Sequence, residues 1–323
     1  MASLRTRRGI LPLIAVAAIA ATSQPALGAN VLVAGSAPGA STIKVYLESL
    51  GHSVTYFSVD TLPTSLAPYS AVWVHTTNSL GVDNLLRLEA FVESGRGVYI
   101  NGEHGLCCAE ASANGDLLVD LTVAGSGSII VGGGFSSGSL NGSPNATAVG
   151  GITQTPYAPP HMALAGAGNI LGVAAGNQLI TSAGNVLAAA WSDADMASGA
   201  GRIVIVMDSN WIESGDIWVD EWVANLQHFL QGPDSDGDGI PDVTDSCTDS
   251  DDDGFGDPGH PIDTCDPDAC PSVPGVAPDG CAVAVPALSA GWRLLLGVIL
   301  VAVASPPTRA AVRRIGIDPA AKR

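Results

Sequence analysis

The sequence predicts an α/β domain with a mainly parallel sheet and helices on both faces, followed by an irregular acidic module and a C-terminal apolar helix. Two features predict the domain, namely short apolar runs and segments with one apolar helical face. Short apolar runs between residues 30 and 232 alternate with segments that carry apolar residues at helical spacing, and this alternation is typical of β-α-β units. A third observation separates the acidic module. Thirteen aspartates lie between Asp234 and Asp268, with no lysine, arginine or glutamate among them.

Residues 1–29 have the features of a secretory signal peptide. Three arginines lie among the first eight residues, and an apolar run from Ile10 to Ala21 is followed by small residues before Asn30. The run has about a dozen residues, whereas a membrane-spanning helix needs roughly 20. A permanent N-terminal anchor is therefore the weaker interpretation. We expect export, which places the cysteines in an oxidising compartment.

The first half of the domain is predicted to run strand, helix, strand, strand, helix, strand. The predicted strands are NVLVAG, SVTYFSV, SAVWVHTT and GVYING, at residues 30–35, 53–59, 70–77 and 97–102. Each helix places apolar residues on one face, namely Ile43, Leu47 and Leu50 in the first and Leu85, Leu88 and Val92 in the second. These segments predict parallel strands with crossover helices.

The second half begins with an elaboration at residues 124–190, which are rich in Gly, Ala, Ser and Asn. Its short β-like runs, SIIVGG, NQLITS and VLAAAW, are predicted to extend one edge of the sheet. The domain closes with the strand GRIVIVMDSN and the helix DIWVDEWVANLQHFL, which carries a wide apolar stripe.

These segments resemble the class I glutamine amidotransferase-like, flavodoxin-like domains. The resemblance covers most of residues 30–232 and is carried by LLRLEAFVESGRGVYINGEHG, PPHMALAGAGNILGV and GRIVIVMDSNWIESGDIWVDEWVANLQHFL. Catalytic members of that family attack an amide with a cysteine on a sharp turn, and a His-x-Glu pair after a late strand activates it. Here Cys107 and Cys108 follow GVYING without a Gly-x-Cys-x-Gly turn, and the stretch MDSNWIES contains no histidine.

The residues nearest to a catalytic set lie in GEHGLCC. Glu103, His104 and Cys107 are close in sequence, and a thiol needs a base within hydrogen-bonding reach to form the thiolate at neutral pH. In the alternative interpretation, Cys107 and Cys108 form a vicinal disulfide or are small buried groups, while Glu103 and His104 end a strand. We favour this alternative, because one fold hosts many functions and a required base is missing. A ligand is expected at the carboxyl ends of the strands.

The charge balance excludes nucleic acid as a partner. Residues 30–285 contain four basic and thirty acidic side chains, a formal charge of −26. A polyanion of this strength repels phosphate backbones and attracts divalent cations.

The acidic module carries two loops with the spacing of calcium ligands. Ca²⁺ takes six to eight oxygens at about 2.3–2.6 Å, and in each loop a glycine, Gly239 or Gly254, falls at the sixth position, where the chain must turn sharply. The first set of predicted ligands is Asp234, Asp236, Asp238, the carbonyl of Ile240, Asp242 and Asp245. The second set is Asp249, Asp251, Asp253, the carbonyl of Phe255 and Asp257, and its closure needs Asp263, Asp266 or water.

A solvated acidic linker is the alternative, but random acidic tracts do not place glycine at the sixth position twice. The two loops with interleaved cysteines resemble thrombospondin type 3 repeats over about residues 234–270, which implies Ca²⁺ as the cofactor. Without the ion, the crowded carboxylates are expected to keep the segment disordered. Four cysteines allow three pairings. We favour disulfides that staple the module at residues 233–284 by joining Cys247 to Cys265 and Cys270 to Cys281.

The segment at residues 285–314 is expected to be a sorting signal with a transmembrane helix. Pro286 to Ser305 gives twenty residues with Arg293 as the single charge. The box VPALS and the following basic cluster resemble the IPTL-CTERM sorting signals of Gram-negative envelope proteins, which implies processing by a sorting protease. The basic cluster, formed by Arg309, Arg313 and Arg314, places the tail at residues 315–323 in the cytoplasm.

Together these features predict an exported calcium-binding protein of the cell envelope or surface of a Gram-negative bacterium, released if its C-terminus is processed. Its α/β domain is expected to be a non-catalytic binding or scaffold domain that acts in adhesion or matrix interaction. Two alternatives stay open: an exported cysteine-dependent amidase or hydrolase, and a carbohydrate-binding surface protein whose ligand enters the elaboration at residues 124–190. The expected partners are calcium ions, the membrane, a sorting protease, and extracellular polysaccharide or protein.

Overall fold

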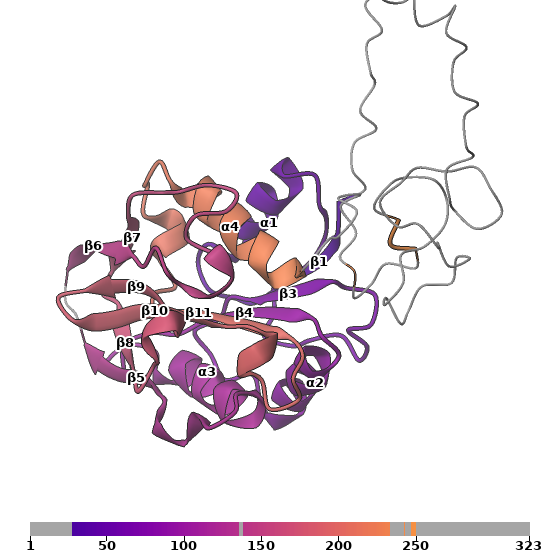
Figure 1. Ribbon diagram of the computed structural model, residues 1–323, viewed down its shortest axis with the longest axis horizontal. Coiled ribbons are helices and arrows are strands. Elements are labelled where there is room, and N and C mark those ends of the chain that lie inside the picture. Colours follow the sequence, from indigo (N-terminus) through magenta and orange to yellow (C-terminus); the bar gives the residue numbers. More distant parts are fainter. Residues whose placement is uncertain (1–27, 136–137, 233–241, 243–246, 250–323) are drawn as a thin grey trace, which may run out of the picture.

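A sheet of eleven strands forms the centre of the molecule, with helices packed against both of its faces (Figure 1). The computed structural model describes residues 28–135, 138–232, 242 and 247–249. Nearly all of the predicted signal peptide, most of the acidic module and the predicted C-terminal helix and tail lie outside these residues. Within the described ranges, no helix combines the length and the apolar character needed to cross a membrane.

Five strands form a parallel half of the sheet, in the spatial order β2, β1, β3, β4 and β11. β3, β4 and β11 are buried along their whole length, which explains why AVWV, GVYIN and RIVIV are rich in apolar residues. The predicted alternation of strand and helix is confirmed for this half. The strands are β1 (Asn30–Ala34), β2 (Ser53–Phe57), β3 (Ala71–Val74), β4 (Gly97–Asn101) and β11 (Arg202–Val206).

The other half of the sheet is antiparallel, so the prediction of a mainly parallel sheet is wrong for the sheet as a whole. β10 pairs antiparallel with β11 and with β9. β6 follows β9 in the sheet, and β7 follows β6. β8 pairs with both β10 and β5. Most of these strands are joined by turns shorter than the crossover of a dozen or more residues that parallel pairing needs. The strands are β5 (Ile130–Phe135), β6 (Ser139–Pro144), β7 (Met162–Ala165), β8 (Gly168–Leu171), β9 (Gln178–Ser182) and β10 (Asn185–Trp191).

The hairpin between β9 and β10 shows how the sequence sets this pairing. Its turn has only two residues, Ala183 and Gly184, with φ angles of 49° and 82°. Positive φ at both positions suits two-residue hairpins, because the twist of the turn then matches that of the strands. Glycine adopts such angles freely, whereas the Cβ of alanine is crowded there.

Two pairs of helices cover the two faces of the sheet (Figure 1). α1 and α4 pack on the face to which Val31 points, and α2 and α3 pack on the face to which Leu32 points, as expected for successive residues of one strand. The α/β class with helices on both faces is therefore confirmed. The helices are α1 (Ala40–Ser49), α2 (Val82–Glu93), α3 (Ala109–Thr122) and α4 (Val219–Gln231).

Short 3₁₀ turns lie in the loops of the described chain. Three of them, η1, η3 and η4, contribute residues to one pocket beside β10. The turns are η1 (Ser126–Ser128), η2 (Val149–Gly151), η3 (Ala175–Asn177), η4 (Asp193–Asp195) and η5 (Trp211–Glu213).

Candidate functional site

Polar residues gather at the carboxyl edge of the parallel strands. β3, β4 and β11 run in the same direction, so the residues that follow them, His75, Glu103 and Asp208, lie at one edge of the sheet. Ligands of open α/β sheets bind at this edge. Glu103 and His104 follow the end of β4, in agreement with the alternative interpretation of GEHGLCC, in which they end a strand.

Glu103 is held rigidly between β4 and β11. Its side chain is buried, and its Oε1 accepts hydrogen bonds from the main-chain N–H of Ser209 at 2.8 Å and from the Ser209 hydroxyl at 2.6 Å. The main-chain N–H of Glu103 donates to Oγ of Ser112 on α3 at 3.0 Å. The two bonds from Ser209 fix the carboxyl group, and the bond to Ser112 fixes the main chain that carries it.

Asp208 is a second buried carboxylate next to Glu103. Its side chain is fully buried and accepts hydrogen bonds from the main-chain N–H groups of Ala165 and of Asn210, the latter at 2.7 Å. Burial, with a smaller effect from the charge of Glu103, raises the pKa of Asp208 to about 6, although the backbone donors act in the opposite direction.

His75 is a buried, neutral histidine. Its Nε2 lies 2.8 Å from the carbonyl oxygens of both Pro38 and Ser209, so Nε2 must carry the proton. Nδ1 then accepts, and it lies 3.4 Å from the hydroxyl of Tyr99, which also accepts a hydrogen bond from Trp211 Nε1 at 2.8 Å. Burial lowers the pKa of His75 to about 4. These groups satisfy one another and form a structural polar network.

Asp60 forms a further polar cluster, which was not predicted from the sequence. It follows β2 and accepts hydrogen bonds from the Ser36 main-chain N–H at 2.9 Å, the Thr76 hydroxyl at 2.6 Å and the Asn78 amide at 2.8 Å. Desolvation raises the pKa of Asp60, but the hydrogen bonds outweigh it, and the net pKa is lowered. The cluster ties together the loops after β1, β2 and β3.

The two cysteines after β4 are bonded to each other. Cys107 and Cys108 form a vicinal disulfide, which is one of the two arrangements that the alternative interpretation of GEHGLCC predicted. Ligand atoms of Glu103, His104 and Cys107 lie within 4.8 Å of one another, so the residues that come nearest to a catalytic set in the sequence do come together. A sulfur in a disulfide is not a thiolate, however, and a nucleophilic cysteine needs the thiolate.

Most of the predicted calcium ligands lie outside the described residues. These are Asp234, Asp236, Asp238, Ile240, Asp245, Asp251, Asp253, Phe255 and Asp257. Asp242 and Asp249 are described, and Asp242 acts electrostatically on Arg202, which also pairs with Asp193. Cys247 takes part in a disulfide. Cys265, Cys270 and Cys281 lie outside the described residues, and the predicted pairings stay predictions.

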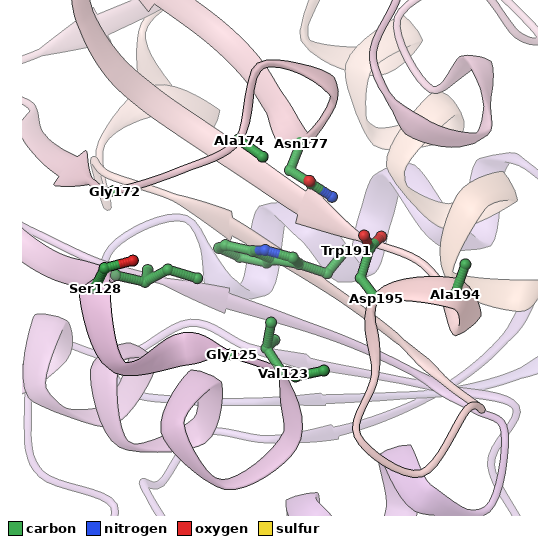
Figure 2. A pocket seen from close by; sticks show the side chains of 11 residues that line it. Val123, Gly125, Ser128, Gly172, Ala174, Asn177, Trp191, Ala194 and Asp195 are labelled. Atoms are coloured by element: carbon green, nitrogen blue, oxygen red, sulfur yellow. The ribbon is translucent and has the colours of Figure 1, made fainter.

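A pocket of about 290 Å³ lies beside β10, between the elaboration and the residues that flank it in sequence (Figure 2). Trp191, the last residue of β10, supplies a flat indole at its centre, and the Asp195 carboxylate lies near one end of the ring in Figure 2. Ser128 lies at the other end, and the amide of Asn177 projects from above the ring. Small residues complete the lining, including Gly125, Gly172 and Ala174.

The polar side chains of this pocket are fixed by their own hydrogen bonds. Oδ2 of Asp195 accepts from the main-chain N–H of Ser192 at 2.9 Å and from its hydroxyl at 3.0 Å, which is a capping box. Nδ2 of Asn177 donates to the carbonyl of Ala190 at 3.0 Å. Trp191 is 2% exposed and belongs to the hydrophobic core on this face of the sheet, so packing holds its indole in place and only a small part of it reaches the pocket.

A carbohydrate site in the elaboration is one of the alternatives predicted from the sequence, but the residues that line this pocket were not predicted. One signal was available: SDAD, directly after the tryptophan of VLAAAW, has the spacing of a capping box. That signal predicts a turn that positions Asp195. It does not predict that residues near 125 and 174 approach the same tryptophan.

Comparisons with known proteins do not assign the chain to a family. No protein-family model and no curated protein matches it. The cytoplasmic protein STM1381 from Salmonella typhimurium LT2 is 14% identical with a TM-score of 0.47, over 63% of this chain and 100% of that one. The cytoplasmic protein STM3548 from Salmonella typhimurium is 12% identical with a TM-score of 0.46, over 63% and 100%. The mmIFT52 N-terminal domain is 10% identical with a TM-score of 0.40, over 60% and 90%.

Proposed function

We propose that the protein is an exported surface protein whose non-catalytic α/β domain binds a neutral sugar unit in the pocket beside Trp191, and whose acidic segment binds calcium. The observation that carries the proposal is the pocket itself. It combines an indole, one carboxylate and one amide, and its lining contains no lysine, arginine or histidine.

The lining chemistry selects the class of ligand. A pyranose has apolar C–H groups that suit the small apolar groups of the lining and the accessible edge of the Trp191 indole, and hydroxyls that donate to carboxylate and amide oxygens such as those of Asp195 and Asn177. An anionic ligand would meet the charge of Asp195 with no cation in the lining, and a wholly apolar ligand would desolvate Oδ1 of Asp195 without offering it a hydrogen bond. Because Trp191 and Asp195 are already fixed, binding requires little ordering of side chains.

The carboxyl edge supports a non-catalytic domain. Amide hydrolysis of the amidotransferase type needs a free thiolate, whereas Cys107 is bonded to Cys108 and Glu103 is engaged by Ser209. The strand order β2, β1, β3, β4, β11 is the 2-1-3-4-5 order of flavodoxin-like sheets, which supports the flavodoxin-like interpretation of the parallel half.

Export, anchoring and calcium binding rest on the sequence. The basic and apolar start, the two aspartate loops with glycine at the sixth position, and the basic C-terminal end support a domain that is displayed outside the cell. The acidic segment follows α4 directly, so it would act as a calcium-stiffened spacer between this domain and the C-terminal signal.

Titration calorimetry on the full chain tests the sugar site, with glucose, galactose, mannose and N-acetylglucosamine as probes. Ala174 is exposed at the pocket, so Ala174→Leu should fill the pocket without disturbing the core and weaken binding at least about tenfold. The matched control is Ala113→Leu at an exposed site on α3, where binding should be unchanged. Absence of binding by all four sugars, or equal affinity of Ala174→Leu and wild type, would contradict the proposal.

A further inference from the structure

We propose that Glu103, His104 and Cys107 form a binding site for a thiophilic divalent cation, with Zn²⁺ as its probe, which opens when the Cys107–Cys108 disulfide is reduced. The carboxylate, imidazole and sulfur ligand atoms lie within 4.8 Å of one another. Zinc takes these three ligand types, and its bonds of about 2.0–2.3 Å place neighbouring tetrahedral ligands about 3.5 Å apart. Small side-chain rotations therefore suffice to bring the three atoms around one ion.

The carboxylate of this site is oriented by a supporting shell. Ser209 occupies Oε1 of Glu103 with two hydrogen bonds, and Ser112 binds the main chain of Glu103. Within the described part of the chain, Oε2 accepts one long hydrogen bond, from the main-chain N–H of His104 at 3.3 Å, so it keeps a lone pair for a cation. Hydrogen bonds that orient a ligand from behind are a regular feature of metal sites.

The site is also reachable from solvent. Glu103 is buried, His104 is half-buried and Cys107 is exposed, which arranges the three ligands from the interior outward. A Cβ added at Gly166 would lie 3.8–3.9 Å from Cδ2 and Nε2 of His104, so the glycine backbone leaves room beside the imidazole.

The redox step releases the sulfur ligand. A water-soluble phosphine gives two electrons to the disulfide and is oxidised to its phosphine oxide, with the oxygen taken from water. The S–S bond breaks, and each sulfur receives one proton from that water. Zn²⁺ then binds the Cys107 thiolate, and the thiol proton is released to the solvent. The oxidised protein offers no thiolate and should bind zinc only through weaker oxygen and nitrogen ligands.

Zinc titration of the full chain before and after phosphine treatment tests the proposal, with millimolar calcium present to occupy acidic sites. We expect reduction to tighten zinc binding at least about 100-fold, because a thiolate is added to the ligand set. With Co²⁺ in place of Zn²⁺, a sulfur-to-metal charge-transfer band should appear only after reduction. Equal zinc affinity in the two redox states, or a cobalt complex without that band, would overturn the proposal.

Two variants locate the site. In reduced protein, Cys107→Ser and His104→Ala should each lose most of the gain in zinc affinity, and both side chains are solvent-accessible enough that the fold should be kept, as circular dichroism can check. Cys247→Ser is the matched control, because it removes a different disulfide-bonded cysteine and should keep the gain. Retention of the gain in Cys107→Ser, or its loss in Cys247→Ser, would place the metal elsewhere. The sugar pocket shares no lining residue with this site, so the two proposals fail independently.

Discussion

Glu103 and Ser209 join the ends of β4 and β11 across the carboxyl edge of the sheet, with Oε1 of Glu103 at 2.8 Å from the Ser209 nitrogen and 2.6 Å from its hydroxyl. Glu103 and Ser209 are 106 residues apart in sequence, so the buried carboxylate links the ends of two distant strands. The residue that the sequence offered as part of a catalytic set has a structural role in the oxidised protein.

Replacement of Ser209 by alanine should lower the free energy of unfolding by about 1–3 kcal/mol, because a buried carboxylate loses one of its donors. Urea denaturation measures the change. Ser198→Ala is the control, since Ser198 is exposed and its hydroxyl bonds only within its own turn. If both variants lost the same stability, the Glu103–Ser209 bond would not be important for the fold.

Asp208 should make stability fall as the pH rises from about 4 to about 6. Its folded pKa, about 6, lies above the unfolded value of 3.8, so the folded state binds the proton more tightly, and this contribution is lost as Asp208 ionises. Relative to Asp208→Asn, the wild type should lose up to about 3 kcal/mol across this window. Urea unfolding of both proteins at several pH values measures the difference, and a constant difference would contradict the prediction.

His75 should have the opposite pH dependence. Its folded pKa of about 4 lies below the unfolded value of 6.5, so the stability it contributes is present above pH 6.5 and is lost as the pH falls toward 4. In nuclear magnetic resonance spectra, the ring protons of His75 should not shift between pH 8 and pH 5. The ring signals of His75 are assigned as those that are absent from the spectrum of His75→Gln. Titration near pH 6.5 would show that His75 is not buried among the two carbonyls and Tyr99.

Replacement of Ala183 by asparagine should raise the free energy of unfolding by about 0.5–1 kcal/mol. Ala183 has a φ of 49° at the first position of the β9–β10 turn, and asparagine followed by glycine is a preferred pair for such turns. Thermal denaturation checks this. Ala197→Asn, at an exposed alanine without positive φ, should give no gain, and an equal gain in both variants would rule out the turn geometry as the cause.

Calcium binding should depend on which aspartate is changed. Asp238 occupies a ligand position of the first loop, whereas Asp252 falls between the ligand positions of the second. Asp238→Asn should therefore weaken calcium binding by the full chain, in the range of about 10⁻⁴–10⁻³ M, more than Asp252→Asn does. Calorimetry with calcium measures both, and equal losses would indicate a solvated acidic spacer.

The parallel half of the sheet was predictable because its signal is local. Runs such as VLVA, AVWV and RIVIV are apolar on both sides of the strand, and helices with one apolar face lie between most of them. Leu50 was predicted on one apolar helical face with Ile43 and Leu47, but it is 39% exposed, because the helix ends at Ser49 and the chain turns away at Gly51.

The antiparallel half and the pocket were not predictable in the same way. Short runs rich in glycine and serine carry little information about their partners, and a turn such as Ala183–Gly184 fixes only one pairing at a time. The pocket joins Ser128, Asn177 and Trp191, which meet only after β10 has paired with β8 and β9. The cluster around Asp60 likewise joins three loops that no local pattern relates.

The most direct test of the sugar-binding domain is a nuclear magnetic resonance titration of isotope-labelled full chain with the tightest of the four sugars. We expect the largest shifts at the indole N–H of Trp191 and the amides of Ser128, Asn177 and Asp195, with little change at Thr76 and Gly102 on the carboxyl edge. Shifts concentrated at the carboxyl edge, or no shifts at saturating sugar, would contradict the account.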